Sequence, residues 1–189
     1  MAGVGVMAVT PIEVRVENVS QLFDTLDPFP FPERDLDKDA EEYIVGWARE
    51  LPRHQAITIL IHLPASELAK HDAKVLANTF KRYFDYRMSI IALDLKELFR
   101  VGRMALSIGL AVLAICLTAS QVMAGRFGAS PLPRFLEESL IIVGWVANWK
   151  PIEIFLYDWW PLARRRNLYR RLADAAIQLK PYDRPGEPG

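Results

Sequence analysis

Cysteine is almost missing from this sequence, and histidine is scarce. The chain has one cysteine, Cys116, and three histidines among 189 residues. A single thiol excludes an internal disulfide framework and any zinc or iron–sulfur site built from several cysteines of one chain. A charge excess is missing too, because 23 basic residues balance 23 acidic ones. Dedicated nucleic-acid-binding proteins carry a basic excess, so we expect no nucleic-acid partner.

Short catalytic motifs are also missing. The sequence contains no HExxH, no P-loop, no G-x-G-x-x-G and no G-x-S-x-G. Asp35, Asp37 and Asp39 alternate like the start of a calcium loop, but Ala40 stands where that loop requires glycine. His62 lies on a predicted strand, where a packed or hydrogen-bonded role is the commoner one. We therefore expect no enzyme activity, no metal and no cofactor.

The sequence does contain one long run without charge, residues 104–125 (MALSIGLAVLAICLTASQVMAG). As an α-helix this run spans about 33 Å, enough to cross a hydrocarbon core of about 30 Å. The alternative, a buried helix of a soluble protein, rarely has such a length. The N-terminal residues lack the basic region and apolar core of a cleavable signal peptide. We predict a first transmembrane helix at 104–125 that acts as an internal signal anchor.

A second apolar segment, residues 139–161, is predicted to cross the membrane but contains polar residues. Its polar and ionisable residues are Asn148, Lys150, Glu153 and Asp158. Its last residues resemble the aromatic belt that marks a membrane interface. The aromatic residues concerned are Tyr157, Trp159 and Trp160.

Lys150 would lie near the middle of this second span, where an unpaired charge costs about 2.5–3.5 kcal/mol. Glu153 lies three residues on, on nearly the same helical face, and can pair with it. Pro151 has no N–H, which predicts a break into two half-helices at Lys150–Pro151. Transporters build ion sites from such breaks, whereas a structural pair joins helices or subunits. A third interpretation, a helix lying in the interface, also stays open.

The charges around the two spans predict their orientation. Two arginines lie in the connection 126–138, whereas eight basic residues lie outside the spans, between Lys96 and Arg171. The positive-inside rule then places both termini in the cytoplasm, and we expect a bacterial-type inner membrane. The basic block after the second span fixes this topology and contacts anionic lipid headgroups. It comprises Arg164, Arg165, Arg166, Arg170 and Arg171.

The first hundred residues predict a small domain with two strands, 12–17 and 56–63, around a helix at 37–51. Asp37 or Asp39 can cap this helix, and Tyr43, Ile44, Trp47 and Leu51 are predicted to form its apolar face. Two strands make a marginal sheet. We therefore expect self-association through this domain, or docking onto the sheet of a partner.

The predicted fold class is a membrane α-helical hairpin of two transmembrane helices with a small N-terminal α+β (β-α-β-α) cytoplasmic domain. The predicted segments are a cytoplasmic domain at 1–64, an amphipathic stalk helix at 65–103, the first span at 104–125, an extracytoplasmic loop at 126–138, the second span at 139–161, a basic amphipathic cytoplasmic helix at 162–180, and a disordered tail at 181–189. The stalk either continues into the first span or breaks near Arg100–Arg103, where Gly102 lowers helix propensity.

Two stretches, FPERDLDKDAEEYIVGWARELP and WKPIEIFLYDWWPLARRR, resemble a group of uncharacterised two-span bacterial inner-membrane proteins. The resemblance extends over most of the chain and implies no activity. The predicted function is that of a non-enzymatic membrane accessory, scaffold or assembly protein that forms homo-oligomers or binds another membrane protein. Trp47 and the loop Asp27–Pro32 are candidate contacts. The alternative is a subunit of an oligomeric ion channel or transporter that uses Lys150 and Glu153.

Overall fold

The computed structural model describes residues 11–24, 35–127 and 131–182. The chain folds as two compact units: residues 1–90 together with 166–189, and residues 91–165. The predicted loop at Asp27–Pro32 and the tail from 183 to 189 lie outside the described residues. We treat the two units separately.

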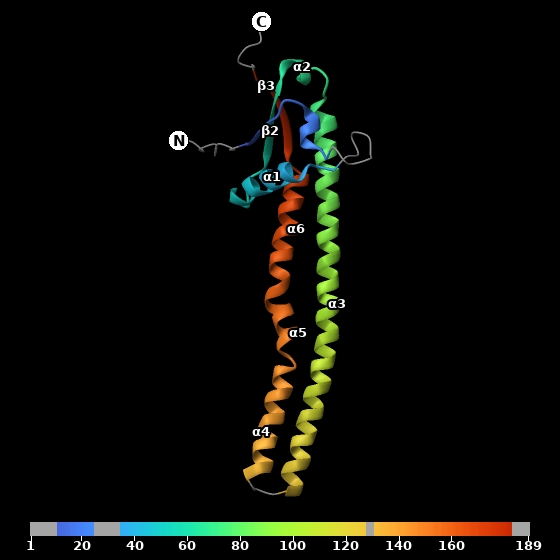
Figure 1. The fold of residues 1–189 in the computed structure, drawn as a ribbon, viewed down its shortest axis with the longest axis vertical. Helices are drawn as coiled ribbons and strands as arrows, with labels where there is room; N and C mark the ends of the chain where they lie inside the picture. The colour runs from blue at the N-terminus through green and yellow to red at the C-terminus, as the bar shows by residue number, and fades with distance from the viewer. Residues whose placement is uncertain (1–10, 25–34, 128–130, 183–189) are drawn as a thin grey trace, which may run out of the picture. The chain divides into compact units, whose positions relative to one another are not determined.

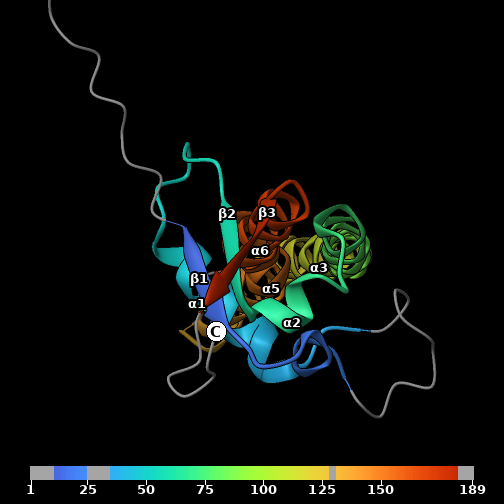
Figure 2. The same ribbon diagram turned by 90° about the horizontal axis from the view of Figure 1, so that it is seen from above.

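The first unit contains a three-stranded parallel sheet with β2 in the middle (Figures 1 and 2). Its strands are β1 (Ile12–Arg15), β2 (Thr58–Pro64) and β3 (Ala176–Tyr182). Ile12 pairs with Ile59, which pairs with Ile177, so these apolar side chains share one face of the sheet. Glu13 and Arg15 alternate with them and are exposed. The predicted β-α-β arrangement is confirmed, with a third strand added.

The third strand corrects the predicted helix at 162–180. Helix α6 (Trp159–Ala173) ends before β3 begins at Ala176. Ile177 and Leu179 are half-buried and alternate with exposed neighbours, which is the period of a strand rather than a helix. Pro181 and Tyr182 belong to β3, not to a tail. The chain's own C-terminal segment thus completes the sheet, which removes the reason for expecting a partner's strand.

Helix α1 (Lys38–Glu50) follows the 3-10 turn η1 (Val19–Leu22) and connects β1 with β2. The Asp37 carboxylate accepts the backbone N–H of Asp39 at 2.9 Å, which confirms Asp37 as the cap. The predicted apolar face is confirmed for Ile44, which is fully buried, but is wrong for Tyr43 and Trp47, which are both 46% exposed. The buried residues of α1 are Glu41, Ile44, Val45 and Ala48. The face of α1 that points into the core therefore carries the Glu41 carboxylate and not the two aromatic rings.

The core of the first unit joins the apolar face of the sheet to α1, α6 and the first part of α3 (Ala73–Phe127). An aromatic row runs through it. Phe80 lies 6.2 Å from both Phe23 and Phe84, and Phe84 lies 6.0 Å from Tyr169, measured between ring centroids. These contacts join segments almost 150 residues apart in the sequence.

Helix α3 runs from Ala73 to Phe127 as one helix, through Arg100–Arg103 without a break (Figure 1). It begins after the single turn α2 (Ala65–Leu68) instead of at residue 65, because the Asp72 carboxylate accepts the backbone N–H of Lys74 at 2.8 Å. The alternative break is therefore wrong. The prediction that the stalk continues into the first uncharged run is confirmed.

The second unit pairs α3 with a chain of shorter helices that runs antiparallel to it. These are α4 (Pro131–Val146), α5 (Trp149–Glu153), the π-helical turn η2 (Ile154–Asp158) and the start of α6. The predicted loop at 126–138 is too long, because α3 reaches Phe127 and α4 begins at Pro131. Pro131 and Pro133 lie in the first turn of α4. Backbone N–H groups of a first turn have no partner within the helix, so proline costs no hydrogen bond there.

Two helices of the structure are long and apolar enough to cross a membrane. One lies within α3, and the other begins at Arg134 and runs through α4, α5 and α6. Most side chains of their apolar windows are exposed: only 17% of the window in α3 is buried.

Candidate functional site

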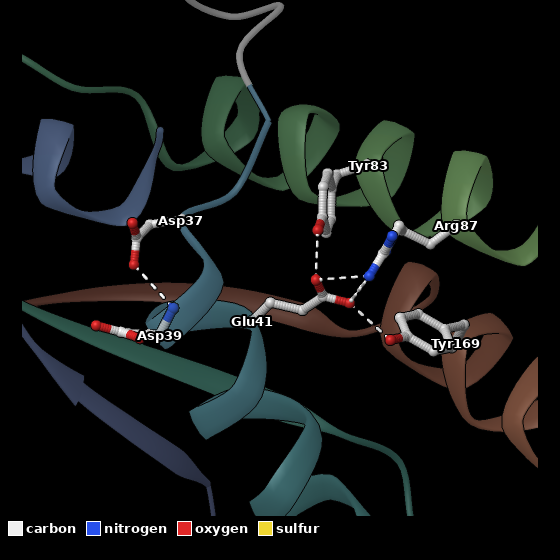
Figure 3. A network of polar contacts seen from close by, with 6 residues as sticks. All are labelled: Asp37, Asp39, Glu41, Tyr83, Arg87 and Tyr169. Atoms are coloured by element: carbon white, nitrogen blue, oxygen red, sulfur yellow. Dashed lines mark hydrogen bonds and ion pairs between the residues drawn. The ribbon is translucent and has the colours of Figure 1, made fainter. Parts of the chain in front are cut away.

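A buried carboxylate, Glu41, lies at the centre of a polar network with Tyr83, Arg87 and Tyr169 (Figure 3). Its side chain belongs to α1, and the residue is only 8% exposed. Oε1 accepts the Tyr169 hydroxyl at 2.6 Å, and Oε2 accepts the Tyr83 hydroxyl at 2.7 Å. The Arg87 guanidinium donates to both oxygens, at 3.0 to 3.1 Å. One carboxylate therefore joins α1 to α3 and α6.

The network fixes the protonation states of its members. Burial acts to raise the pKa of Glu41, but the hydrogen bonds from Tyr169, Tyr83 and Arg87 outweigh it and lower that pKa overall. Burial raises the pKa of Tyr83, and the neighbouring carboxylate raises it further. Burial would lower the pKa of Arg87, yet its bonds to Glu41 raise it overall. Glu41 is thus anionic and Arg87 cationic at neutral pH.

The geometry of Glu41 suits a structural tie better than catalysis. Both of its oxygens already accept hydrogen bonds from side chains, so neither is free to take a proton from a substrate. Sequence reasoning missed this network and did not single out Glu41. Tyr83 and Arg87 lie four residues apart, which places them on one face. The sequence could have indicated a shared polar partner for Tyr83 and Arg87 from this spacing, but the spacing does not identify Glu41 as that partner.

The predicted intramembrane pair, Lys150 and Glu153, is close in the structure. Lys150 Nζ lies 3.1 Å from Glu153 Oε2 and 3.4 Å from Asp158 Oδ2. Asp158 is eight residues away, which is more than two α-helical turns. The π-helical turn Ile154–Asp158 inserts an extra residue per turn and re-aims the side chains after it. The side chain of Lys150 is 63% exposed, whereas those of Glu153 and Asp158 are 43% and 33% exposed.

The helix pairing places Lys150 beside the beginning of the uncharged run. A Cβ added to Gly102 would lie 2.9 Å from Ile154 Cγ2, so Ile154 is level with Gly102. Lys150 precedes Ile154 by one helical turn, about 6 Å along the axis. Relative to α3, Lys150 therefore lies about one turn inside Arg103, the residue that precedes the run. The expectation that Lys150 lies near the middle of the second span stays a prediction, although this pairing places it beside the beginning of the uncharged run rather than beside its middle.

Asn148 marks the break in the second apolar segment. The break lies at Ala147–Asn148, before the predicted position at Lys150–Pro151. Pro151 instead occupies the first turn of α5. A backbone N–H in the first turn makes no hydrogen bond within the helix, so the missing N–H of proline is tolerated there. Asn148 Nδ2 donates to Gly144 O at 2.9 Å and to Gly109 O at 3.1 Å. The side chain thus closes the end of α4 and joins it to α3.

Gly109 is required for that contact. A Cβ at position 109 would lie 2.7 Å from Asn148 Oδ1 and 2.9 Å from Ala147 O, closer than real side chains approach. Gly144 is less constrained, because its added Cβ would lie 2.7 Å from Leu113 Cδ1, the end of a flexible side chain, and 3.3 Å from Leu113 Cα. Asn148 is 6% exposed, and its Oδ1 accepts no hydrogen bond among the described residues. That oxygen faces the Cα of Gly109, a weak donor.

The basic block divides into two kinds of residue. Arg171 Nη2 donates to Pro52 O at 2.9 Å and to Gln55 O at 3.0 Å, so this guanidinium holds the loop between α1 and β2. Arg164 lies 5.8 Å above the Trp160 ring, a cation–π distance. Arg165, Arg166 and Arg170 are exposed. The predicted contact with lipid headgroups therefore stays a prediction for these four arginines, whereas Arg171 serves the fold.

The predicted interfacial aromatics lie at the same end of the second unit as the charged triad, which consists of Lys150, Glu153 and Asp158. Tyr157 and Trp160 are exposed, whereas Trp159 donates its indole N–H to Phe155 O at 3.0 Å. Phe155 stacks on Phe99 of α3 with ring centroids 6.1 Å apart. Two aromatic rings thus face outward here, which an aromatic belt requires.

The remaining titratable candidates do not converge. Among the described residues, no group of three or more His, Cys, Asp or Glu side chains could hold a metal. His62 Nε2 lies 3.4 Å from Glu13 Oε2 and is otherwise enclosed. Cys116 is buried in α3 and packs toward Gly144. Comparison with known proteins finds no matching family model, curated protein or solved structure.

Proposed function

We propose that this chain is an integral membrane protein with two spans. The observation that carries the proposal is the exposure of the two apolar helices. The core helix of a soluble protein is mostly buried, whereas Ile108, Ile115, Phe135 and Trp145 are each more than 60% exposed. An apolar surface of this length in water is strongly unfavourable, and a hydrocarbon environment removes the penalty.

The charge distribution supports an orientation with both termini in the cytoplasm of a bacterial-type cell. Arg103 lies at one end of the uncharged run, and the charged triad of Lys150, Glu153 and Asp158 lies at the same end. These charges then meet the headgroups, where long side chains extend toward water. Arg126 lies at the opposite end. The pairing of α3 with α4 and α5 thus brings the charges of both helices to the same level.

We further propose that the protein is a non-enzymatic accessory or assembly factor that self-associates or binds another membrane protein. Its most buried carboxylate, Glu41, is committed to joining three helices. Outside the core, α1 presents Tyr43 and Trp47 with ring centroids 6.3 Å apart, an exposed aromatic pair suited to a protein contact.

To test the two-span proposal, the full chain is expressed in bacteria and the membranes are extracted with alkaline carbonate. An integral protein stays in the pellet, whereas release into the supernatant contradicts the two-span proposal. Purification in mild detergent then sizes the particle and identifies copurifying chains by mass. A particle larger than one chain supports an assembly role. A strictly monomeric particle without partners contradicts it.

The channel or transporter alternative rests on the triad around Lys150. Two spans cannot enclose a path, so this function requires an oligomer. The position of Lys150 one turn from the end of the uncharged run favours a structural ion pair over a site at mid-membrane. Ion flux into liposomes that contain the purified protein distinguishes a transport site from a structural ion pair. Flux that Lys150→Leu abolishes supports transport, and no flux from the native protein contradicts it.

A further inference from the structure

The outward face of α1 carries two aromatic rings between two carboxylates. Four exposed residues lie within an arc of about 80° around this helix, on the side opposite its buried residues. They form what we call the α1 stripe: Asp39, Tyr43, Trp47 and Glu50. Among the described residues, the side chains of Asp39 and Glu50 form no ion pair. The stripe is therefore both anionic and aromatic, which suits a guanidinium, because arginine pairs with carboxylates and also lies on ring faces.

The opposite charge is unpaired on α6. Arg166 and Arg170 are exposed, lie one helical turn apart and form no ion pair within the described part of the chain. Asp174, one turn beyond Arg170, lies 3.8 Å from Lys81 instead. Like charges at this spacing repel each other, and a neighbouring anion removes the repulsion. The arginine pair, Arg166 and Arg170, is thus stabilised by an acidic group from another molecule.

The core of the first unit holds these two surfaces close to one level. Tyr169, which precedes Arg170, donates its hydroxyl to Glu41 at 2.6 Å (Figure 3). Glu41 lies between Asp39 and Tyr43 on α1. Copies that are anchored in one membrane share one orientation across it, so each copy presents its stripe and its arginine pair at similar heights. Neighbouring copies can then bring the two surfaces together.

We propose that the α1 stripe of one copy binds the arginine pair of a neighbouring copy. The guanidinium groups lie on the rings of Tyr43 and Trp47 and pair with the carboxylates at the two ends of the stripe. The chain already contains such a stacking contact, since Arg15 lies 4.0 Å above the Tyr182 ring. Two different surfaces meet, so the contact is head-to-tail and leads to rings or rows of copies. The inference rests on the proposed self-association and assigns it to these surfaces.

Anionic lipid headgroups are the competing partner of the arginine pair. Headgroups neutralise Arg166 and Arg170 but leave the α1 stripe without a partner. Their attraction for the arginines does not depend on the charge of α1. A change of the stripe alone therefore distinguishes the two partners.

An exchange of charges between two copies tests the contact. Two differently tagged full chains are coexpressed, and one is captured in mild detergent at low salt. Reversal of the arginine pair (Arg166→Glu with Arg170→Glu) in both copies is expected to lower recovery of the second tag at least about fivefold. Reversal of the stripe (Asp39→Lys with Glu50→Lys) in both copies has the same expected effect. An arginine-reversed copy combined with a stripe-reversed copy restores at least about half of the native recovery, because opposite charges meet again.

The matched control, Arg53→Glu with Lys74→Glu, makes the same change of charge at exposed positions outside both surfaces. Its recovery should stay within about twofold of native. Native recovery from either reversed chain, or no restoration in the combined copies, overturns the interface. A loss caused by the arginine reversal alone assigns the arginine pair to headgroups and also overturns it. Native copies that do not recover each other refute the proposed self-association itself, whereas association that both reversals leave unchanged refutes these surfaces alone.

Discussion

At the scale of single residues, Glu41 is the most consequential side chain of the first unit. Its three donors come from α3 and α6, and two of them are tyrosine hydroxyls. A buried charge is tolerated when it is paired and its lone pairs are satisfied, and Glu41 meets both conditions. Loss of one member leaves the others buried without their partner. This network therefore makes the fold sensitive at a position that resembles an ordinary surface acid.

We expect Glu41→Gln to lower the free energy of unfolding by about 2–4 kcal/mol, because Arg87 then lacks its counter-charge. The matched control is Glu42→Gln, one residue on and exposed, which should change stability by less than about 0.5 kcal/mol. Thermal unfolding of the full chain in detergent, followed by circular dichroism, measures both. Equal effects for the two variants contradict the structural role of Glu41.

The same carboxylate makes stability depend on pH. The pKa of Glu41 in the folded chain lies below its ordinary value of 4.5. Its contribution is therefore complete above pH 4.5 and is lost as pH falls through the lower folded value. We expect the stability difference between native and Glu41→Gln chains to be large at pH 7 and to shrink by pH 3. A difference that stays constant between these pH values argues against the lowered pKa.

At the scale of elements, the contact of α3 with α4 and α5 depends on three glycines. Gly102, Gly109 and Gly144 each lie where an added Cβ would come within 3 Å of the facing helix. Small residues of this kind let helix backbones approach closely, which increases the van der Waals contact between the helices. Asn148 adds a hydrogen bond to Gly109 O at the one break in the second helix.

We expect Gly109→Ala to destabilise this helix pair by about 1–3 kcal/mol, because the new methyl group displaces Asn148. Gly46→Ala on α1 is the control, since nothing lies within 4 Å of its added Cβ. Higher helix propensity should make that variant as stable as the native chain or up to about 1 kcal/mol more stable. Thermal unfolding in detergent compares them. A Gly109→Ala chain as stable as native would falsify the tight approach.

The sequence alone predicted those elements whose structure is set by residues close to one another in the chain. The uncharged run, the cap at Asp37 and the two N-terminal strands follow from local chemistry, and the structure contains them. β3 was missed because its alternation covers only Ile177 and Leu179, and its partner β2 lies over a hundred residues earlier. The break at Asn148 was placed at Pro151, because proline is a local signal and the contact with Gly109 is not. Glu41 was missed for the same reason.

At the scale of the whole molecule, charge and exposure agree on one arrangement. The net charge of zero separates into 16 acidic and 12 basic residues over 1–100 and a basic excess around α6. Between them lie two helices whose apolar side chains are mostly exposed. The sheet-bearing unit is built from both ends of the chain, so β1 and β3 must lie on the same side of any membrane that α3 and α4 cross. An even number of crossings satisfies this condition, and two spans provide it.

The central claim is that two spans hold both chain ends on one side of a membrane. Single cysteines at Lys70 and at Ser130, in chains with Cys116→Ser, test it in intact bacteria with a membrane-impermeant maleimide. We predict labelling of Ser130→Cys in intact cells and of Lys70→Cys only after lysis. The reverse pattern contradicts the orientation, and labelling of both positions only after lysis contradicts membrane crossing itself.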